Sequence, residues 1–553
     1  MSKNLSHLSG RKGLQKNLFD ELGILSQPSG TVPKEQLDRL KNEFLFGHAN
    51  LHGTITFYDF LKPENQGKKV YVCNGTACLC AGKQPTLKDK LLSQFKEEEI
   101  GDMCCLGRCH ENNAFHYQGQ NYSGITAEKF VKEGSKSSSF SGLDKYTIDH
   151  EGTPILTSIE ENKEYCQKSI HDFLQVDHEK LLEELKLSGL RGRGGAGFPI
   201  SFKLESCKNT ISDTKFIVCN ADEGDPGAYS DRYIMEHKPF TLLIGMMAAG
   251  YITGAEWGVL YIRGEYPESV QIMSDAVQSL TEWGLLGENI LGLNFSFQFK
   301  VIKAQGAYIC GEETALLSSI EGQRPEVRVR PPYPTQYGLF QKPTVVNNVE
   351  TLACIPPILK NGGQWYAGIG KGKSTGTKLL SLDSYFNRPG IYEVDMGTPL
   401  DTVVYSLGQG FKSPVKAMHI GGPLGGMVPM HKIKDLTVDF ESFQENGFLL
   451  GHGSFVCIPE SFQMIQYIRH LFQFTAHESC GKCFPCRLGS TRGYELMDKA
   501  LEGDYKIERA LINDLLETLE LGSLCALGGG LPLPIKNILQ YFDEELKEYF
   551  TAS

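Results

Sequence analysis

A cysteine pattern in the last hundred residues has the spacing of an iron–sulfur site. Cys480, Cys483 and Cys486 stand at CxxCxxC spacing, and Cys525 lies further along the chain. Three thiolates in one tight loop can converge on a single centre, and a fourth from a distant turn completes the ligands of a ferredoxin-type 4Fe–4S cluster. Structural zinc is the alternative, but zinc usually takes its ligands as two separated pairs. The spacing therefore favours a 4Fe–4S cluster.

A second group of cysteines lies between residues 73 and 109. Its members are Cys73, Cys78, Cys80, Cys104, Cys105 and Cys109. The pairs Cys73/Cys78 and Cys105/Cys109 would supply four thiolates from two loops, which suits a 2Fe–2S cluster. Two loop pairs also suit zinc, so the spacing alone leaves both metals open. The neighbouring Cys80 and Cys104 leave open which four cysteines bind.

A glycine-rich run, Arg191-Gly-Arg-Gly-Gly-Ala-Gly197, contains the pattern GxGxxG at Gly192, Gly194 and Gly197. A charged helix predicted over 178–187 precedes it, not a buried strand, so the context differs from that of a Rossmann dinucleotide fingerprint. Without Cβ atoms, the backbone can still approach a phosphate or a flat ring closely. A plain glycine-rich turn is an equally good interpretation of the run by itself.

Polar residues follow the predicted strand 215–219. The run Asn220-Ala-Asp-Glu-Gly-Asp225 comes directly after it. Strand ends in an α/β layer are the usual place for ligands, and carboxylates there suit ribose hydroxyls. A solvated acidic turn is the alternative. Two more segments, 306–314 and 347–351, are further candidates, and the paired amides of Asn347 and Asn348 could donate to and accept from a heterocycle or a phosphate. Each segment could equally be a capped helix start.

The composition is that of a large globular protein. The 553 residues are 41% hydrophobic and 22% charged, which predicts three or four domains with ample apolar material for several cores. The net charge of −11 argues against a nucleic-acid coat and against a polybasic membrane binder. The most apolar stretch, 241–255, is too short and too glycine-rich to span a bilayer, so we expect a buried helix. No secretory signal pattern opens the chain, which predicts a cytoplasmic protein.

The order of predicted elements changes along the chain. Short amphipathic helices are expected over 14–61, and a strand over 69–73 feeds the first cysteine loop. The polar run 134–142 is the best linker candidate. Alternating strands and helices over 150–375 predict an α/β layer. Short strands with Gly and Pro turns follow over 378–427, and residues 462–550 are expected to be helical.

Taken together, these motifs resemble two electron-transfer subunits joined in one chain. Residues 15–130, with the phrase Thr56-Phe-Tyr58 and the first cysteine group, are similar to the thioredoxin-like 2Fe–2S subunit of respiratory complex I and its relatives. Residues 150–550 resemble the NADH-binding flavoprotein subunit through every motif described above. Such fusions occur as diaphorase subunits of NAD-dependent formate dehydrogenases and NAD-reducing hydrogenases. The phrases at 486–493 and 524–530 are most similar to the formate dehydrogenase β subunits.

The resemblance implies a multidomain chain of α/β and α+β class. The expected parts are an N-terminal helical segment (1–65), a thioredoxin-like 2Fe–2S domain (66–142), a central Rossmann-like domain for FMN and NADH (143–375), a small ubiquitin-like β-grasp domain (376–455) and a C-terminal helical bundle with the 4Fe–4S cluster (456–553).

The resemblance also implies which residues hold the cofactors. FMN would be held at its phosphate and ring region by Gly192, Gly194, Gly195, Gly197 and Lys203. Its isoalloxazine and ribityl groups would contact Asn220, Asp222 and Glu223. Gly311, Glu312 and Glu313 would line the same cavity, and Asn347, Asn348 and Thr351 would close over the phosphate. The 4Fe–4S cluster would take Cys480, Cys483, Cys486 and Cys525, and the 2Fe–2S cluster Cys73, Cys78, Cys105 and Cys109.

The same resemblance implies how NADH would lie. Its adenine would stack between Phe198 and Tyr333, and its nicotinamide would lie near Tyr308 and Glu313. Asp225 would face the adenosine ribose, where complex I members usually have Glu; its charge predicts NADH over NADPH. In the PPYP phrase, Arg330 and Tyr333 replace the usual Lys and Phe, and Pro325 replaces a Gly in the preceding loop. No catalytic acid or base is implied, since the hydride moves between cofactors.

The expected function is electron transfer between NAD(H), FMN and iron–sulfur clusters within a larger complex. The implied partners are an iron–sulfur subunit and the catalytic subunit of a formate dehydrogenase, with a hydrogenase or a complex I-like enzyme as the alternative. Neither nucleic acid nor membrane insertion is expected. A zinc-stabilised scaffold without redox chemistry is the alternative from another class; it would explain eight cluster cysteines but not the flavin-loop motifs.

Overall fold

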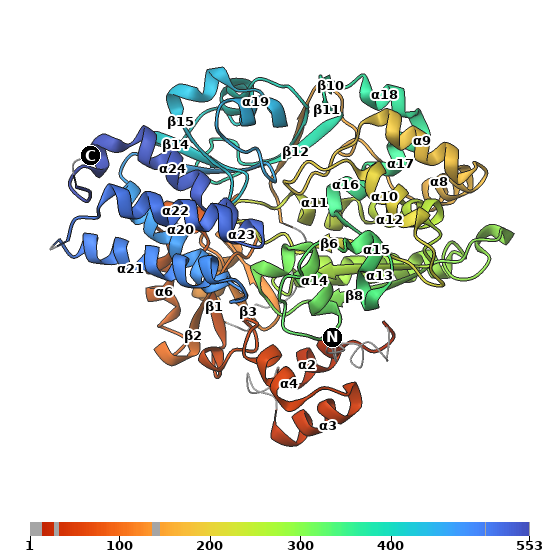
Figure 1. Ribbon diagram of the computed structural model, residues 1–553, viewed down its shortest axis with the longest axis horizontal. Helices are drawn as coiled ribbons and strands as arrows, with labels where there is room; N and C mark the ends of the chain where they lie inside the picture. The colour runs from red at the N-terminus through yellow and green to blue at the C-terminus, as the bar shows by residue number, and fades with distance from the viewer. Residues whose placement is uncertain (1–13, 27–32, 135–143, 504, 552–553) are drawn as a thin grey trace.

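The computed structural model describes residues 14–26, 33–134, 144–503 and 505–551 (Figure 1). Three short helices, α2 (Leu18–Ser26), α3 (Lys34–Phe44) and α4 (His48–Ile55), form the N-terminal end, as the sequence predicts. They lie together at one edge of the molecule, drawn red in Figure 1. Beyond Gly134, the predicted linker 134–142 lies outside the described residues.

The thioredoxin-like domain brings the first cysteine group to one end of its four-stranded sheet. Its four strands, in the order β2-β1-β3-β4, are β1 (Val70–Cys73), β2 (Ile100–Met103), β3 (Phe115–Tyr117) and β4 (Gln120–Tyr122). Helices α5 (Thr76–Ala81), α6 (Gln84–Leu91) and α7 (Gly124–Glu133) complete it. Because β1 and β2 are parallel, the cysteine loops that follow them leave the sheet at the same end.

The central domain is a parallel sheet with helices packed against it. Its strand order is β8-β7-β6-β9, with β6 (Phe216–Ala221), β7 (Trp257–Ile262), β8 (Gln298–Lys303) and β9 (Thr344–Asn348), all parallel. The helices are α8 (Lys163–Leu174), α9 (His178–Ser188), α10 (Ile200–Asn209), α11 (Ser230–His237), α12 (Pro239–Thr253), α13 (Pro267–Glu282), α14 (Glu313–Ile320), α16 (Val349–Ala353) and α17 (Ile355–Asn361). As predicted, a charged helix, α9, precedes the glycine run.

The apolar stretch 241–255 forms the buried helix α12, as predicted. Gly245 allows this helix to approach α16, because a Cβ there would lie 2.0 Å from the carbonyl oxygen of Leu352. No helix in the described part of the chain is both long and apolar enough to cross a membrane.

The small sheet has the strand order of a ubiquitin-like β-grasp. β12 (Thr377–Leu382) and β13 (Gly390–Asp395) form a hairpin, β14 (Val415–Ile420) and β15 (Gly426–Pro429) form a second, and β16 (Ser454–Pro459) lies between them, parallel to β12. The sheet gains a sixth strand, β5 (Thr147–Glu151), beside β13. This strand comes from the range expected for the flavin domain, so the two parts are interlaced in sequence.

The last part of the chain is helical, as predicted. It contains α20 (Met464–Glu478), α21 (Ser490–Leu501), α22 (Arg509–Gly522), α23 (Ala526–Gly530) and α24 (Pro532–Tyr541). Figure 1 shows these helices, in blue, on the side of the molecule opposite α8 and α9. The second cysteine group lies in the turns that join them.

Candidate functional site

The predicted polar residues meet at the carboxyl ends of β6 and β9. The two strands are parallel neighbours, and their register pairs Cys219 with Asn347 and Asn220 with Asn348. The side-chain amide of Asn220 donates to the carbonyl oxygen of Gly311 at 2.8 Å, which joins a third segment to this edge. Three segments far apart in the sequence therefore converge on one site.

The glycine run closes over this edge as a tight loop. A Cβ on Gly194 would lie 3.0 Å from the Cβ of Asn348, so only glycine fits without displacing that residue. Gly195 has a φ of +117° and Gly197 one of +59°, which favour glycine as well. The backbone N–H of Arg193 donates to the hydroxyl of Thr351 at 2.8 Å. The loop is thus fixed to the start of α16.

Two buried polar atoms at this edge have no partner among the described residues. They are Oδ2 of Asp222 and Nδ2 of Asn347. Burial also raises the pKa of Asp222 well above its usual range. An unpaired buried polar group costs about 1–3 kcal/mol, so two of them next to a glycine cradle fit a polar ligand. Flavin mononucleotide, with its phosphate, ribityl hydroxyls and heteroatom-rich ring, has the matching groups.

Three charged side chains, each from a different segment, border the site. The Lys203 Nζ lies 3.0 Å from a carboxylate oxygen of Glu313, and Arg330 lies 2.7 Å from the other. Lys203 also donates to the carbonyl oxygen of Val346 at 3.0 Å. Glu312, by contrast, accepts the backbone N–H groups of Thr314 and Ala315 and so caps α14. Its other oxygen lies 3.6 Å from Arg330, so Arg330 faces both carboxylates, whereas Lys203 pairs with Glu313.

Tyr308 and Asp225 form a contact on the other side of the acidic run. The Tyr308 hydroxyl donates to Oδ1 of Asp225 at 2.7 Å. The ring lies against Gly224, where a Cβ would come within 2.6 Å of it, and packs edge to face on Phe474 at 5.0 Å. Burial raises the pKa of Asp225. Tyr308 thus holds the carboxylate of Asp225 in place. The resemblance predicts that this carboxylate sets the choice between NADH and NADPH.

The two aromatic residues predicted to hold adenine are both exposed. Phe198 is 45% exposed and Tyr333 is 54% exposed, which is unusual for large apolar rings. Phe198 packs edge to face on Phe202 at 5.6 Å. The described residues show no ring contact between Phe198 and Tyr333, so each ring offers a free face.

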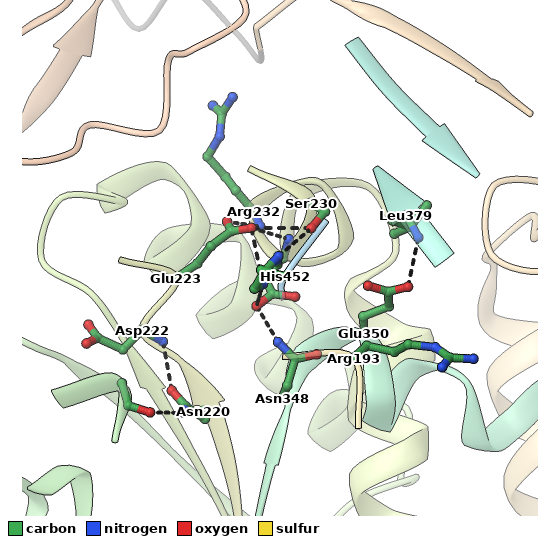
Figure 2. A network of polar contacts seen from close by, with 12 residues as sticks. Arg193, Asn220, Asp222, Glu223, Ser230, Arg232, Asn348, Glu350, Leu379 and His452 are labelled. Atoms are coloured by element: carbon green, nitrogen blue, oxygen red, sulfur yellow. Dashed lines mark hydrogen bonds and ion pairs between the residues drawn. The ribbon is translucent and has the colours of Figure 1, made fainter. Parts of the chain in front are cut away.

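Glu223 has a role that the sequence does not reveal. Its carboxylate accepts the backbone N–H groups of Asp231 at 2.9 Å and Arg232 at 3.1 Å, so it caps the first turn of α11. Figure 2 shows this carboxylate beside His452, apart from Asp222 and Asn220. Burial raises the pKa of Glu223 to about 7. The prediction that Glu223 contacts the ring system stays a prediction, and its observed contacts are structural.

His452 is a buried member of the site that sequence reasoning missed. It precedes β16 in the β-grasp part, and its Nε2 lies 3.1 Å from Oδ2 of Asp231. That same oxygen accepts from the Asn348 amide at 2.6 Å. Burial alone would favour the neutral imidazole, but the carboxylates of Asp231 and Glu223 raise the pKa of His452 to about 9. A protonated histidine thus ties the β-grasp part to the strand edge.

We expect the thermal stability of the protein to fall as the pH rises from 7 to 9.5, and His452→Gln to remove most of that fall. Folding raises the pKa of His452 from 6.5 to about 9 and that of Glu223 from 4.5 to about 7. The folded state therefore binds both protons more tightly; this stabilisation is complete below the unfolded values and is lost as the pH rises through the folded ones. Melting curves should show a fall of roughly 2–3 °C in the wild type, because a chain of 553 residues has a large entropy of unfolding. Equal falls in both proteins would contradict this role of His452.

The first cysteine group brings four thiols together. Cys73 lies beside both Cys78 and Cys105, and the Sγ atoms of Cys105 and Cys109 are 3.5 Å apart. Gly75 allows the two loops to approach, because a Cβ there would lie 3.1 Å from the Cβ of Cys105. These four are the predicted ligands, and their donor set and spacing fit a 2Fe–2S cluster.

The two ambiguous cysteines of this stretch have different surroundings. Cys80 lies near the carboxylate of Asp383, and burial raises its pKa well above the usual range. Cys104 lies near Glu478 and Arg263, and burial raises its pKa as well. Each also lies near one of the four predicted ligands, Cys80 near Cys78 and Cys104 near Cys105, so the choice of ligands stays a prediction.

The second cysteine group lies between the end of α20, the turn Pro485–Gly489 and the start of α23. Cys480 and Cys486 are buried, whereas Cys483 and Cys525 are partly exposed. Burial raises the pKa of Cys486 to about 11 and that of Cys525 to about 12. All sixteen cysteines of the chain are free thiols. Four convergent thiols without disulfides fit a 4Fe–4S cluster, whose iron would supply the positive charge that stabilises the buried thiolates.

Three family models match successive parts of the chain. The thioredoxin-like [2Fe-2S] ferredoxin model matches residues 6–133. The Nuo51 FMN-binding domain model matches residues 185–357. The NADH-ubiquinone oxidoreductase-F iron–sulfur binding region matches residues 466–549. Each match covers one of the sites described above.

Curated relatives match from two thirds to nearly all of the chain. The NADP-reducing hydrogenase subunit HndC of Solidesulfovibrio fructosivorans is 40% identical over 373 residues, which are 67% of this chain and 76% of the relative. An NADH-quinone oxidoreductase subunit of Rhizobium meliloti is 39% identical over 66% of this chain and 88% of the relative. The NAD-reducing hydrogenase HoxS subunit alpha of Cupriavidus necator is 30% identical over 95% of this chain and 91% of the relative.

A solved structure matches almost the whole chain. A chain of an NAD+-reducing [NiFe]-hydrogenase in its H2-reduced state superposes with a TM-score of 0.85 and 26% identity, over 98% of this chain and 94% of that one.

The fold and the site together define a flavin- and iron–sulfur-dependent oxidoreductase. The chain belongs to the family of diaphorase subunits that includes the NADH-quinone oxidoreductase relative and the hydrogenase subunits HndC and HoxS alpha. It carries an FMN site, a thioredoxin-like 2Fe–2S domain and a 4Fe–4S region in one polypeptide. The family thus confirms the predicted cofactors and enzyme class.

Proposed function

We propose that this chain passes electrons between NAD(H) and an iron–sulfur partner subunit, through FMN bound at the carboxyl ends of β6 and β9. One observation carries the proposal: the same site contacts the segments of both cysteine groups. The backbone N–H of Tyr308 donates to Glu478, two residues before Cys480, at 2.8 Å. On the other side, the carbonyl oxygen of Glu223 shares the guanidinium of Arg263 with the carbonyl oxygen of Cys104.

The residues of the site would divide the work of binding and orientation. FMN, when bound, takes two electrons from NADH as a hydride and releases them singly to iron–sulfur clusters. The glycine loop 192–197 and Lys203 would hold its phosphate and ring region. Phe198 and Tyr333 would stack on the adenine of NADH, and Tyr308 and Glu313 would orient the nicotinamide. No side chain needs to transfer a proton for this chemistry.

An exposed apolar patch beside the second cysteine group supports a docking partner. It consists of Phe484 (68% exposed), Leu488 (56%), Leu521 (77%) and Leu524 (45%). Phe484 lies between two of the cluster cysteines, and Leu524 directly precedes Cys525. Clustered apolar side chains at a protein surface mark interaction sites. We therefore place the iron–sulfur partner over this patch, next to the 4Fe–4S site.

Two catalytic partners are candidates. The sequence phrases around Cys486 and Cys525 favour a formate dehydrogenase, whereas the full-length matches to hydrogenase subunits favour a hydrogenase. An affinity-tagged chain, purified anaerobically with its bound subunits, distinguishes them by NAD+ reduction with formate or with H2. Activity with formate supports the first candidate and activity with H2 the second. If the purified complex oxidises NADH but reduces NAD+ with neither formate nor H2, both candidates are overturned.

Reconstitution tests the zinc scaffold separately. A chain that stays colourless after reconstitution with FMN, iron and sulfide indicates the zinc scaffold.

We expect Asp225→Ser to relax the choice of coenzyme. The carboxylate of Asp225 is held by Tyr308 and would repel the 2′-phosphate of NADPH, since like charges brought together are costly. Steady-state kinetics with ferricyanide should show the NADPH-to-NADH ratio of kcat/KM rising about tenfold or more. Asp225→Glu is the control, because it keeps the charge and should keep the preference for NADH. An unchanged ratio in the serine variant would remove Asp225 from this role.

A further inference from the structure

The turn that follows β7 joins the flavin side of the molecule to the first cysteine group. This turn, residues 263–266, contains Arg263, which is 3% exposed, Glu265, which is 1% exposed, and Tyr266, which is fully buried. Polar side chains buried this deeply need specific partners. Those partners belong to two loops that lie far apart in the sequence.

Arg263 makes one contact to each loop. Its Nη1 donates to the carbonyl oxygen of Glu223 at 2.5 Å, on the acidic run that borders the FMN site. Its Nη2 donates to the carbonyl oxygen of Cys104 at 3.2 Å, next to the cluster cysteine Cys105. The same Nη2 lies 2.8 Å from Oε1 of Glu265. One guanidinium therefore connects the two redox sites.

Tyr266 makes the same connection from the other end of the turn. Its hydroxyl donates to Oε2 of Glu223 at 3.2 Å. Its ring lies against Gly107, where a Cβ would come within 2.5 Å, so only glycine fits between the cluster cysteines of this loop. The N–H of Gly107 points to the Sγ of Cys105 at 3.4 Å. The ring of Tyr266 thus packs directly against the loop that carries Cys105 and Cys109, two of the four thiols.

We propose that Arg263 is a positioning residue that raises the reduction potential of the 2Fe–2S cluster relative to the flavin, with Glu265 as the charge that limits this effect. The proposal rests on the proposed function, in which both cofactors bind to this chain. Reduction adds one negative charge to the cluster, and a buried positive charge nearby stabilises the reduced form because little water screens it. Cluster potentials depend on such charges and on hydrogen bonds to the sulfurs.

The surroundings of the thiols support the direction of this effect. Arg263 donates to the backbone of the cluster loop at the carbonyl oxygen of Cys104, whereas the carboxylate of Glu265 lies against the guanidinium itself. The charge of Arg263 acts on both Cys104 and Asp222, and that of Glu265 acts on Asp222. The cation is therefore the nearer of the two charges to the cluster loop.

The redox step that Arg263 affects is a single electron transfer. One electron leaves the reduced flavin and enters the oxidised 2Fe–2S cluster, so the flavin is oxidised by one electron and the cluster is reduced by one. No bond forms or breaks in the protein, and no further reactant is needed. The charge of Arg263 shifts the equilibrium of this step toward the reduced cluster.

The test is a potentiometric titration of the full chain, loaded with its cofactors and followed by electron paramagnetic resonance. Dithionite and redox mediators set the potential, so the result does not depend on whether NADH reacts. We expect Arg263→Gln to lower the 2Fe–2S midpoint by the equivalent of at least a tenfold change in the electron-transfer equilibrium, which is 59 mV for a one-electron couple. Arg263→Lys should keep most of the wild-type value. The 4Fe–4S cluster in the same sample is the internal control.

Glu265→Gln provides the test of opposite sign, and it holds even if Arg263→Gln fails to assemble the cluster. Removal of this carboxylate leaves the cation unopposed, so the 2Fe–2S midpoint should rise. An unchanged midpoint in both glutamine variants, or shifts in the same direction, would overturn the proposal. Equal shifts of both clusters would also overturn it, because they would show a general change of the protein. If the clusters titrate normally but NADH reduces neither, the proposed function fails and the role of Arg263 is still decided.

Discussion

Cys486→Ser is expected to remove the 4Fe–4S cluster and to stop NADH-dependent reduction of the partner subunit. Cys486 is 4% exposed and lies at the centre of the second cysteine group, between the end of α20 and the start of α23. A serine hydroxyl is a far weaker iron ligand than a thiolate, which is the form that holds such clusters. Electron transfer to the partner should fall by about 100-fold or more, as expected when a ligand rather than a supporting residue is lost.

The flavin should remain active in this variant. NADH oxidation with ferricyanide needs only the flavin, so it should stay within about threefold of the wild type, a range that corresponds to less than 1 kcal/mol. Cys207→Ser is the control, because Cys207 is equally buried but lies in α10, away from both clusters. A full 4Fe–4S resonance signal in Cys486→Ser, or its loss in Cys207→Ser, would contradict the ligand assignment.

Gly194→Ala is expected to weaken FMN binding strongly, whereas Gly192→Ala is not. A Cβ at position 194 would lie 3.0 Å from the Cβ of Asn348, and Asn348 cannot move away easily because its amide is held by Asp231 at 2.6 Å. At position 192, the nearest atom would be the carbonyl oxygen of Phe198 at an ordinary 3.5 Å. The flavin dissociation constant of Gly194→Ala should rise about 10–100-fold, a loss of roughly 1.4–2.7 kcal/mol.

Fluorescence titration of the apoprotein with FMN measures this difference directly. The two variants add the same methyl group to the same loop, and neither glycine has a positive φ. The comparison therefore isolates the contact with Asn348 from general effects of losing a glycine. Equal weakening in both variants would show that the loop does not hold the flavin through position 194.

Much of the site could be predicted because its chemistry is local in the sequence. The cysteine spacings name the thiols, and the structure brings together Cys73, Cys78, Cys105 and Cys109 across two loops. Asn220 and Asn348 could be placed at the site because parallel strands end at the same edge of a sheet. The order of helices and strands could likewise be predicted from the amino-acid composition and from the spacing of apolar residues along the chain.

The contacts that depend on the tertiary fold could not be predicted. His452 reaches Asp231 from a part of the chain more than 200 positions away, and nothing in its neighbourhood marks it as charged. Glu223 looks like a ligand residue in the acidic run, yet its carboxylate caps α11. Arg263 carries no motif at all. β5 joins a sheet whose other strands begin at Thr377, which no local pattern could indicate.

Under the proposed function, one polypeptide carries electrons from NADH through FMN to both cysteine groups. An anaerobic titration of the purified, cofactor-loaded chain with NADH, followed by visible absorption and electron paramagnetic resonance, tests it most directly. We expect the flavin band to bleach together with the broad iron–sulfur absorption, and the signals of a reduced 2Fe–2S and a reduced 4Fe–4S cluster to grow. A chain whose flavin and clusters are reduced by dithionite but remain oxidised with NADH would contradict the account.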